Sequence, residues 1–145
     1  MTIRESDIQI QACGLWAEAN AAEEAGRLVE AEALYTVAAE LGYDLAMNSL
    51  AVLLEDVIQP PRAAEAVYWL KRAVDAGSDM AAWNLAMRQR LAGRRRWYIH
   101  WLKIADRMGC EEAGQALAVA TTRDDIWWAL DGVPPPPFVK GPRLG

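Results

Sequence analysis

The sequence predicts an all-α fold built from short antiparallel helix pairs that stack on one another, and three observations lead to this prediction. A block of residues ending in glycine is repeated, the apolar residues before each glycine have helical spacing, and alanine is abundant. Alanine favours helix because it loses no side-chain entropy on folding. β-Branched residues other than valine are few, which disfavours sheet.

The repeated block has a large apolar residue eight positions before its glycine and an alanine four positions before it. Its copies are Leu34–Gly42, Trp69–Gly77 and Trp101–Gly109. The glycines lie 35 and then 32 residues apart, and after each one the chain resumes with a similar Ala-rich segment. Such a period is typical of solenoid repeats, whose units bury their apolar faces only by stacking.

The predicted elements follow from this pattern in order along the chain. The expected helices are near 7–25, 29–41, 44–57, 62–76, 79–91, 95–108 and 111–121. Each repeat glycine is expected at the left-handed position that ends a helix. Asp44, and Ser78 or Asp79, offer oxygens to cap the helices that follow. Pro60 and Pro61 suit a helix start, where a missing N–H costs nothing.

The C-terminal part is expected to close the solenoid. Thr122 and Asp125 resemble a capping box that opens a short helix containing Trp127 and Trp128, which would cover the exposed end of the last repeat. Four successive prolines then impose a polyproline II segment. We therefore predict a helical repeat domain with its capping helix over 1–132 and a proline-rich tail over 133–145, whose role as cap or as ligand for another domain stays open.

Charge is distributed unevenly along the chain. Residues 1–56 carry two basic side chains against eleven acidic ones, whereas residues 57–110 carry ten basic against four acidic, within a net charge of −5 for the chain. We expect an acidic first part and a basic middle, which would steer charged partners.

The repeat resembles a known family. Residues 66–86 look like the Sel-one-like repeat, a relative of the tetratricopeptide repeat, and residues 25–39 are similar to the tetratricopeptide pattern itself. The resemblance covers about residues 12–120 and departs at 56–61, where Asp-Val-Ile-Gln-Pro-Pro replaces a glycine-rich turn. It implies a short right-handed α-solenoid of about three to four helix pairs whose first helices line a concave face that receives a partner protein.

Carried over by position, the resemblance implies a partner-binding face made by side chains of three first helices. These residues are Trp16, Asn20, Glu23, Asn48, Val52, Glu55, Trp83, Met87 and Arg90. Trp16 and Trp83 would be its apolar anchors, because aromatic residues often anchor interfaces. The alternative is that either tryptophan only packs between repeat units.

The sequence does not favour an enzyme, a cofactor or a metal site. The chain has one histidine, His100, no Gly-rich phosphate loop, and acidic pairs whose adjacent members diverge on a helix. Cys13 and Cys110 are expected to be free thiols. With no long apolar run and no secretory signal, we expect a cytoplasmic protein with no membrane partner.

A basic run leads into aromatic residues and raises a nucleic-acid hypothesis. Arg88, Arg90 and the arginines at 94–96 precede Trp97 and Tyr98. Arginines neutralise phosphates and aromatic rings stack on bases. The acidity of the whole chain counts against a nucleic-acid partner, and the run also fits a solvated turn or a contact for a partner's acidic patch.

Protein binding is the function that these patterns favour. A small acidic chain without catalytic groups suits a bacterial immunity protein that neutralises a cognate toxin encoded nearby. A general adaptor or regulatory repeat protein in signalling or secretion is the alternative.

Overall fold

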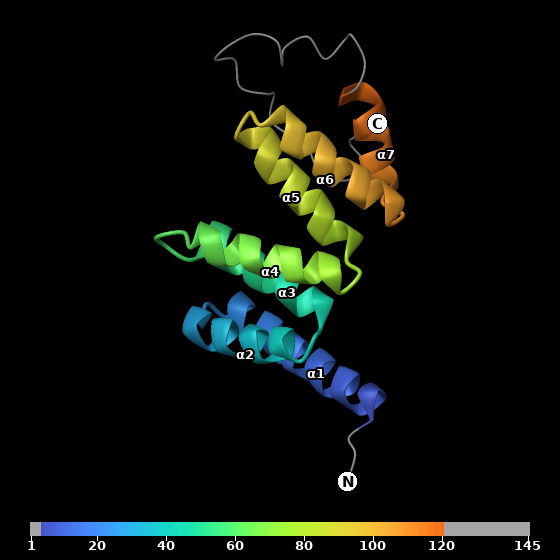
Figure 1. Cartoon of the computed structure of the whole chain (residues 1–145). Coiled ribbons are helices and arrows are strands. Elements are labelled where there is room, and N and C mark those ends of the chain that lie inside the picture. Colours follow the sequence, from blue (N-terminus) through green and yellow to red (C-terminus); the bar gives the residue numbers. More distant parts are fainter. Residues whose placement is uncertain (1–3, 121–145) are drawn as a thin grey trace. The chain divides into compact units, whose positions relative to one another are not determined.

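The computed structural model of the chain describes residues 4–120, which form helices joined by short turns (Figure 1). The α-helices are α1 (Glu5–Glu24), α2 (Leu28–Glu40), α3 (Asp44–Val52), α4 (Ala63–Asp75), α5 (Asp79–Leu91), α6 (Arg95–Arg107) and α7 (Glu111–Ala120). No strand occurs within this range. The all-α prediction is therefore confirmed for the described part of the chain, and the expected helix ends agree to within two residues except in the third helix.

The chain divides into two compact units, Met1–Ser78 and Asp79–Gly145. In the first unit, α1 packs on α2, α2 on α3, and α3 on α4. In the second unit, α5 packs on α6 and α6 on α7. Within each unit, each helix thus contacts its neighbours in sequence, as expected for a helical repeat. The predicted capping helix and proline-rich tail lie outside the described residues.

The glycine turns have the predicted geometry. Gly77 has a φ of +99°, its N–H donates to the Val74 carbonyl at 2.9 Å, and the Ser78 N–H donates to the Ala73 carbonyl at 2.9 Å. This pair of bonds ends a helix by satisfying its last carbonyl groups. Gly42 and Gly109 also have positive φ angles, of 94° and 99°. The repeat glycines therefore end helices as the sequence predicts.

Small residues let the paired helices approach closely. The alanine four positions before each repeat glycine has no exposed surface. These residues are Ala38, Ala73 and Ala105. Larger side chains fill the rest of each unit, with Leu50, Leu53 and Leu54 buried in the first and Leu85 and Leu102 in the second. Each unit therefore has a core of its own.

The third helix differs from the prediction of one regular helix over 44–57. It changes at Leu53 into a five-residue π-helical turn, η1 (Leu53–Val57), in which the Ile58 N–H donates to the Leu53 carbonyl at 2.9 Å. Leu53 and Leu54, the first two residues of this turn, are both completely buried.

The predicted helix caps are only partly correct. Tyr43, not Asp44, occupies the capping position of α3 and forms no side-chain cap bond, so Asp44 lies in the first turn, where its charge favours the helix dipole. The Ser78 hydroxyl accepts a hydrogen bond from the Asn48 amide at 3.1 Å. The Asp79 carboxylate accepts one from the Met80 N–H at 2.9 Å.

An ion-pair cluster ties α2 to the start of α4. The Arg62 guanidinium donates to both carboxylate oxygens of Glu32, at 2.8 and 3.1 Å, and to those of Glu65, at 3.0 and 2.7 Å. The hydrogen bonds from Arg62 hold the pKa of the Glu65 carboxyl below its usual value. This cluster fixes the chain where it leaves the proline-containing turn.

None of the helices among residues 4–120 is both long and apolar enough to cross a bilayer.

Candidate partner-binding surface

The nine predicted partner-binding residues are shared between the two units. Six of them, from Trp16 to Glu55, lie in the first unit, and Trp83, Met87 and Arg90 lie in the second. A single concave face made by all nine stays a prediction.

Two of the predicted residues, Asn20 and Glu23, contact the same hydroxyl group, that of Tyr35. Tyr35 lies on α2 and is 1% exposed, and its hydroxyl oxygen is 2.6 Å from Asn20 Oδ1 and 2.7 Å from Glu23 Oε1. Both partners lie on α1 and are half-buried. Asn20 and Glu23 are therefore held in fixed positions while part of each side chain still faces solvent.

The single hydrogen of a phenol can serve only one acceptor at a time. The Glu23 carboxylate is the stronger acceptor, so we assign the Tyr35 hydrogen to Glu23. The Asn20 amide then turns so that its NH₂ group donates to the Tyr35 oxygen, because amide oxygen and nitrogen are exchangeable by a simple flip. In this arrangement the Tyr35 hydroxyl donates to Glu23 and accepts from Asn20.

Burial and charge keep Tyr35 protonated. Burial raises the pKa of the Tyr35 hydroxyl most, followed by its hydrogen bond to Glu23 and by the charges of Glu23 and Glu24. A hydrogen bond from Ser49 acts in the opposite direction. The Tyr35 hydroxyl therefore stays protonated, and able to donate a hydrogen bond, at pH values well above 7.

Trp16 belongs to the same cluster through Ser49. Its indole N–H donates to the Ser49 hydroxyl of α3 at 3.0 Å. Its ring lies edge-on to Tyr43, with centroids 5.9 Å apart. Trp16 is half-buried, so it both links α1 to α3 and presents part of its ring at the surface.

Two of the predicted contact residues are buried. Asn48 is 6% exposed and donates to Ser78, while Trp83 is 5% exposed within the second unit. Trp16, Asn48 and Trp83 occupy the same repeat position. Both side chains therefore expose little surface to a partner, and their role in binding stays a prediction.

The remaining predicted residues reach the surface to different degrees. Val52 is 44% exposed at the end of α3, and Glu55 is half-buried in η1. Met87 is half-buried on α5, and the Arg90 guanidinium lies 5.9 Å from the centroid of the Tyr98 ring. Val52 is therefore the most accessible of the nine.

Sequence reasoning missed Tyr35 and Ser49, which organise the cluster. Tyr35 lies seven positions before its repeat glycine, where the other copies have Leu70 and Leu102. A phenol in a position that otherwise holds buried leucine needs a polar partner nearby. The tyrosine at a position that holds leucine in the other copies was therefore the signal in the sequence that could have revealed this cluster.

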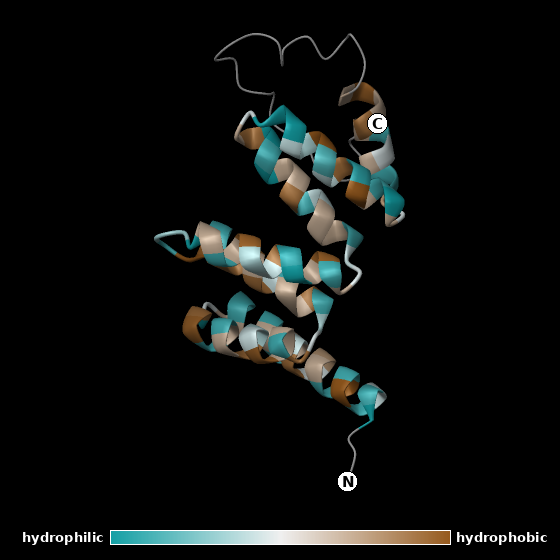
Figure 2. Ribbon diagram, in the orientation of Figure 1, coloured by the Kyte–Doolittle hydropathy of each residue, from teal (hydrophilic) through white to brown (hydrophobic). Residues whose placement is uncertain are grey.

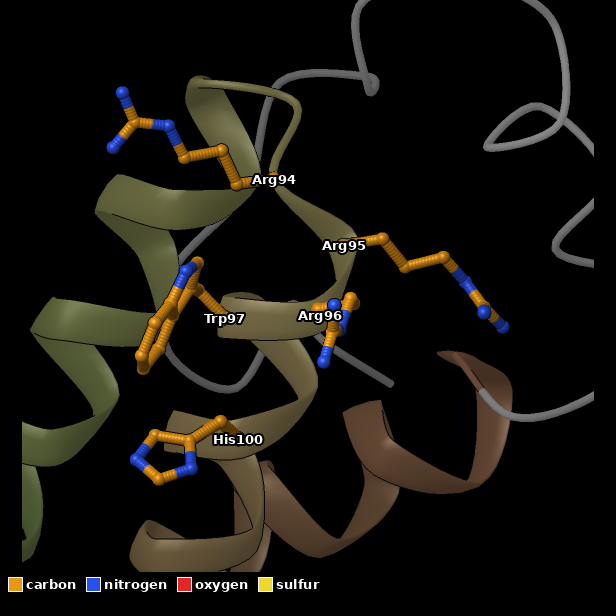
Figure 3. Close-up of a pocket in the computed structure, with 5 residues that line it drawn as sticks. All are labelled: Arg94, Arg95, Arg96, Trp97 and His100. Carbon is orange, nitrogen blue, oxygen red and sulfur yellow. The ribbon is translucent and has the colours of Figure 1, made fainter.

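The arginine-rich turn forms a second candidate surface. Figure 2 shows hydrophilic residues gathered where α5 ends and α6 begins. Side chains from the start of α6 line a hollow there, and these are Arg94, Arg95, Arg96, Trp97 and His100. In Figure 3, Trp97 and His100 lie on one side of the helix, one turn apart, and Arg95 points to the other side. The Arg95 guanidinium donates to the Ala120 carbonyl at 2.7 Å.

The thiols and acidic groups show no metal centre. Cys13 and Cys110 are free thiols, the first exposed and the second buried. Burial raises the pKa of the Cys110 thiol. Within residues 4–120, no three histidine, cysteine or acidic side chains are grouped so that they could hold a metal ion.

Comparison with known proteins found no related protein. The chain matches no protein-family model, no curated protein and no solved structure.

Proposed function

We propose that this chain is a protein-binding module that holds one specific partner protein through the concave face of a short right-handed helical solenoid. The observation that carries this proposal is the cluster around Tyr35, which orients Asn20, Glu23 and Trp16 on α1 while leaving each partly exposed. Side chains fixed before binding lose little conformational entropy when a partner arrives.

The chemistry of the first unit defines the kind of partner. Its exposed and half-buried groups include Glu23, Glu55 and the aromatic ring of Trp16, with Val52 as an apolar neighbour on α3. Residues 1–56 carry a net charge of −9. A basic protein surface with an apolar patch would complement this face, and its association would be accelerated by the charge.

Neutralisation of a basic toxin is the specific version of this function that we propose. A small cytoplasmic binder without catalytic residues suits an immunity protein, whose task is to cover a toxin made by the same cell. A general adaptor is the second version, and the identity of the captured partner distinguishes the two.

The test is affinity capture of the partner followed by its identification, repeated with two surface variants. Val52→Arg places a positive charge beside Glu55 on the proposed face. Val37→Arg makes the same change on α2 at a residue of similar exposure, 47% against 44% for Val52. We expect Val52→Arg to lose the partner and Val37→Arg to retain it.

The captured partner is then purified and its affinity for each variant is measured. Equal affinity for both variants would show that the proposed face is not the contact surface. For the toxin version, co-expression must relieve the toxicity of the partner. If the partner is not toxic and no toxin gene lies beside the gene of this chain, the toxin version is wrong and the result supports a general adaptor.

A further inference from the structure

The outward face of α6 carries a row of cationic and aromatic side chains. Tyr98, Leu102 and Ala105 face the core of the second unit. On the opposite side, exposed residues recur at intervals of four, three and four positions, namely Arg96, His100, Lys103 and Arg107. At a rise of about 1.5 Å per residue, this row is roughly 16 Å long.

The exposed aromatic ring of Trp97 lies beside this row. Trp97 is 55% exposed, unusually high for the largest apolar side chain. Its ring stands edge-on to that of His100, with centroids 5.3 Å apart. Figure 3 shows both rings on the same side of α6, with Arg96 beside them.

The positive charges of this face are not neutralised within the described part of the chain. Arg94, Arg96, Lys103 and Arg107 have no ion pair within 4.0 Å among these residues. The one carboxylate on α6 is Asp106, whose Oδ1 lies 2.8 Å from the point where a β-carbon at Gly114 would stand. It therefore points toward α7.

The other copies of the repeat show that the fold does not require basic side chains at these positions. The four equivalent positions of α2 hold Val29, Ala33, Thr36 and Glu40. Those of α4 hold Ala64, Tyr68, Lys71 and Asp75. Only in α6 are all four basic or imidazole side chains, so the basic face is a property of this repeat.

We propose that the outward face of α6 binds single-stranded nucleic acid. The cations would contact phosphates along the strand, and Trp97 with His100 would stack on unpaired bases. Positively charged surfaces combined with stacking aromatic residues are the usual means of binding single strands.

The composition of this face favours nucleic acid over an acidic protein. The core of a protein interface is depleted in charge and rich in apolar residues. Here Trp97 is the one large apolar side chain of α6 that is exposed, and cations surround it. Nucleic-acid interfaces are more polar and much more positive. The acidic residues that give the chain its net negative charge are concentrated in residues 1–56, in the unit that does not contain α6.

The test measures fluorescence anisotropy of a labelled single-stranded polyuridine RNA of about 12 nucleotides with the purified full chain at several salt concentrations. We expect binding that weakens as salt rises. Trp97→Ala should weaken it about 5- to 150-fold without changing the salt dependence, because stacking is not ionic. Arg96→Gln with Lys103→Gln should reduce the slope of log K against log salt by about 0.7 per charge removed.

Lys71→Gln is the matched control, because Lys71 occupies in α4 the repeat position of Lys103. It should leave binding unchanged. No binding at low salt would overturn the proposal. An unchanged affinity for Trp97→Ala, or equal binding of a polyglutamate peptide, would also overturn it and indicate an acidic protein segment. Salt-sensitive self-association that blocks the RNA would point instead to a second copy of the chain.

Discussion

Tyr35 is the residue on which the polar cluster of the first unit depends. Its hydroxyl contacts both Asn20 and Glu23, and it does so from a side chain that is 1% exposed. A hydrogen bond to a charged partner contributes more than one between neutral groups. The same contact therefore stabilises the α1–α2 pair and orients two candidate binding residues.

Tyr35→Phe is expected to lower the free energy of unfolding by about 1–2 kcal/mol, because it removes hydrogen bonds to partners that water can still reach in part. Urea unfolding followed by circular dichroism measures this. Tyr68→Phe is the control, since Tyr68 is 52% exposed and should change stability by less than about 0.5 kcal/mol. Equal losses in both variants would contradict the role assigned to Tyr35.

The raised pKa of Tyr35 predicts a loss of stability in alkali. Above the ordinary phenol pKa of about 10, the unfolded chain releases the proton that the folded chain retains. The free energy of unfolding therefore falls as pH rises, by up to about 1.4 kcal/mol per pH unit from this group. Unfolding at pH values on either side of 10 should show the advantage of wild type over Tyr35→Phe shrinking with pH. A constant advantage would exclude this mechanism.

At the scale of the elements, glycine turns decide where α1, α2, α4, α5 and α6 end. Gly77 has a φ of +99°, a conformation that side chains with a β-carbon disfavour, whereas Gly14 lies inside α1 with a negative φ. An added β-carbon would meet no atom within 4 Å at either position. The two glycines therefore differ in backbone conformation and not in crowding.

Gly77→Ala is expected to destabilise the fold by about 1–2 kcal/mol through backbone strain. Gly14→Ala is expected to stabilise it by about 0.5–1 kcal/mol, because alanine is the better residue inside a helix. Thermal or urea unfolding of both variants measures the difference. A loss of stability at Gly14 as large as that at Gly77 would mean that space, not φ, governs these sites.

At the scale of the whole molecule, the chain has two units with separate cores. Leu50 is 1% exposed in the first unit, and Leu102 is completely buried in the second. Helical repeats gain stability from their own cores and from their nearest neighbours in sequence. A cavity in one unit should therefore weaken that unit more than the other.

Leu50→Ala and Leu102→Ala are each expected to cost about 2–5 kcal/mol in the unit that carries them. Amide hydrogen exchange, resolved by peptide, would report the loss separately for α1–α4 and α5–α7. Equal loss of protection in both units for either variant would show that they unfold as one.

The sequence by itself determined the helices and, except for the third, where they end. Helical spacing, alanine content and the glycines at 42, 77 and 109 act locally, within one or two helical turns, so they can be read directly from the chain. The same holds for the basic residues of α6, whose spacing already places them on one face.

Only the tertiary structure decided which side chains are available for binding. Trp16 and Trp83 have the same place in the repeat, yet Trp83 is buried and Trp16 is half-exposed and bonded to Ser49. The π-helical turn at Leu53 likewise was not predicted, because the sequence indicated one regular helix over 44–57. Burial and hydrogen bonding of this kind depend on residues distant in sequence, and a local pattern does not contain them.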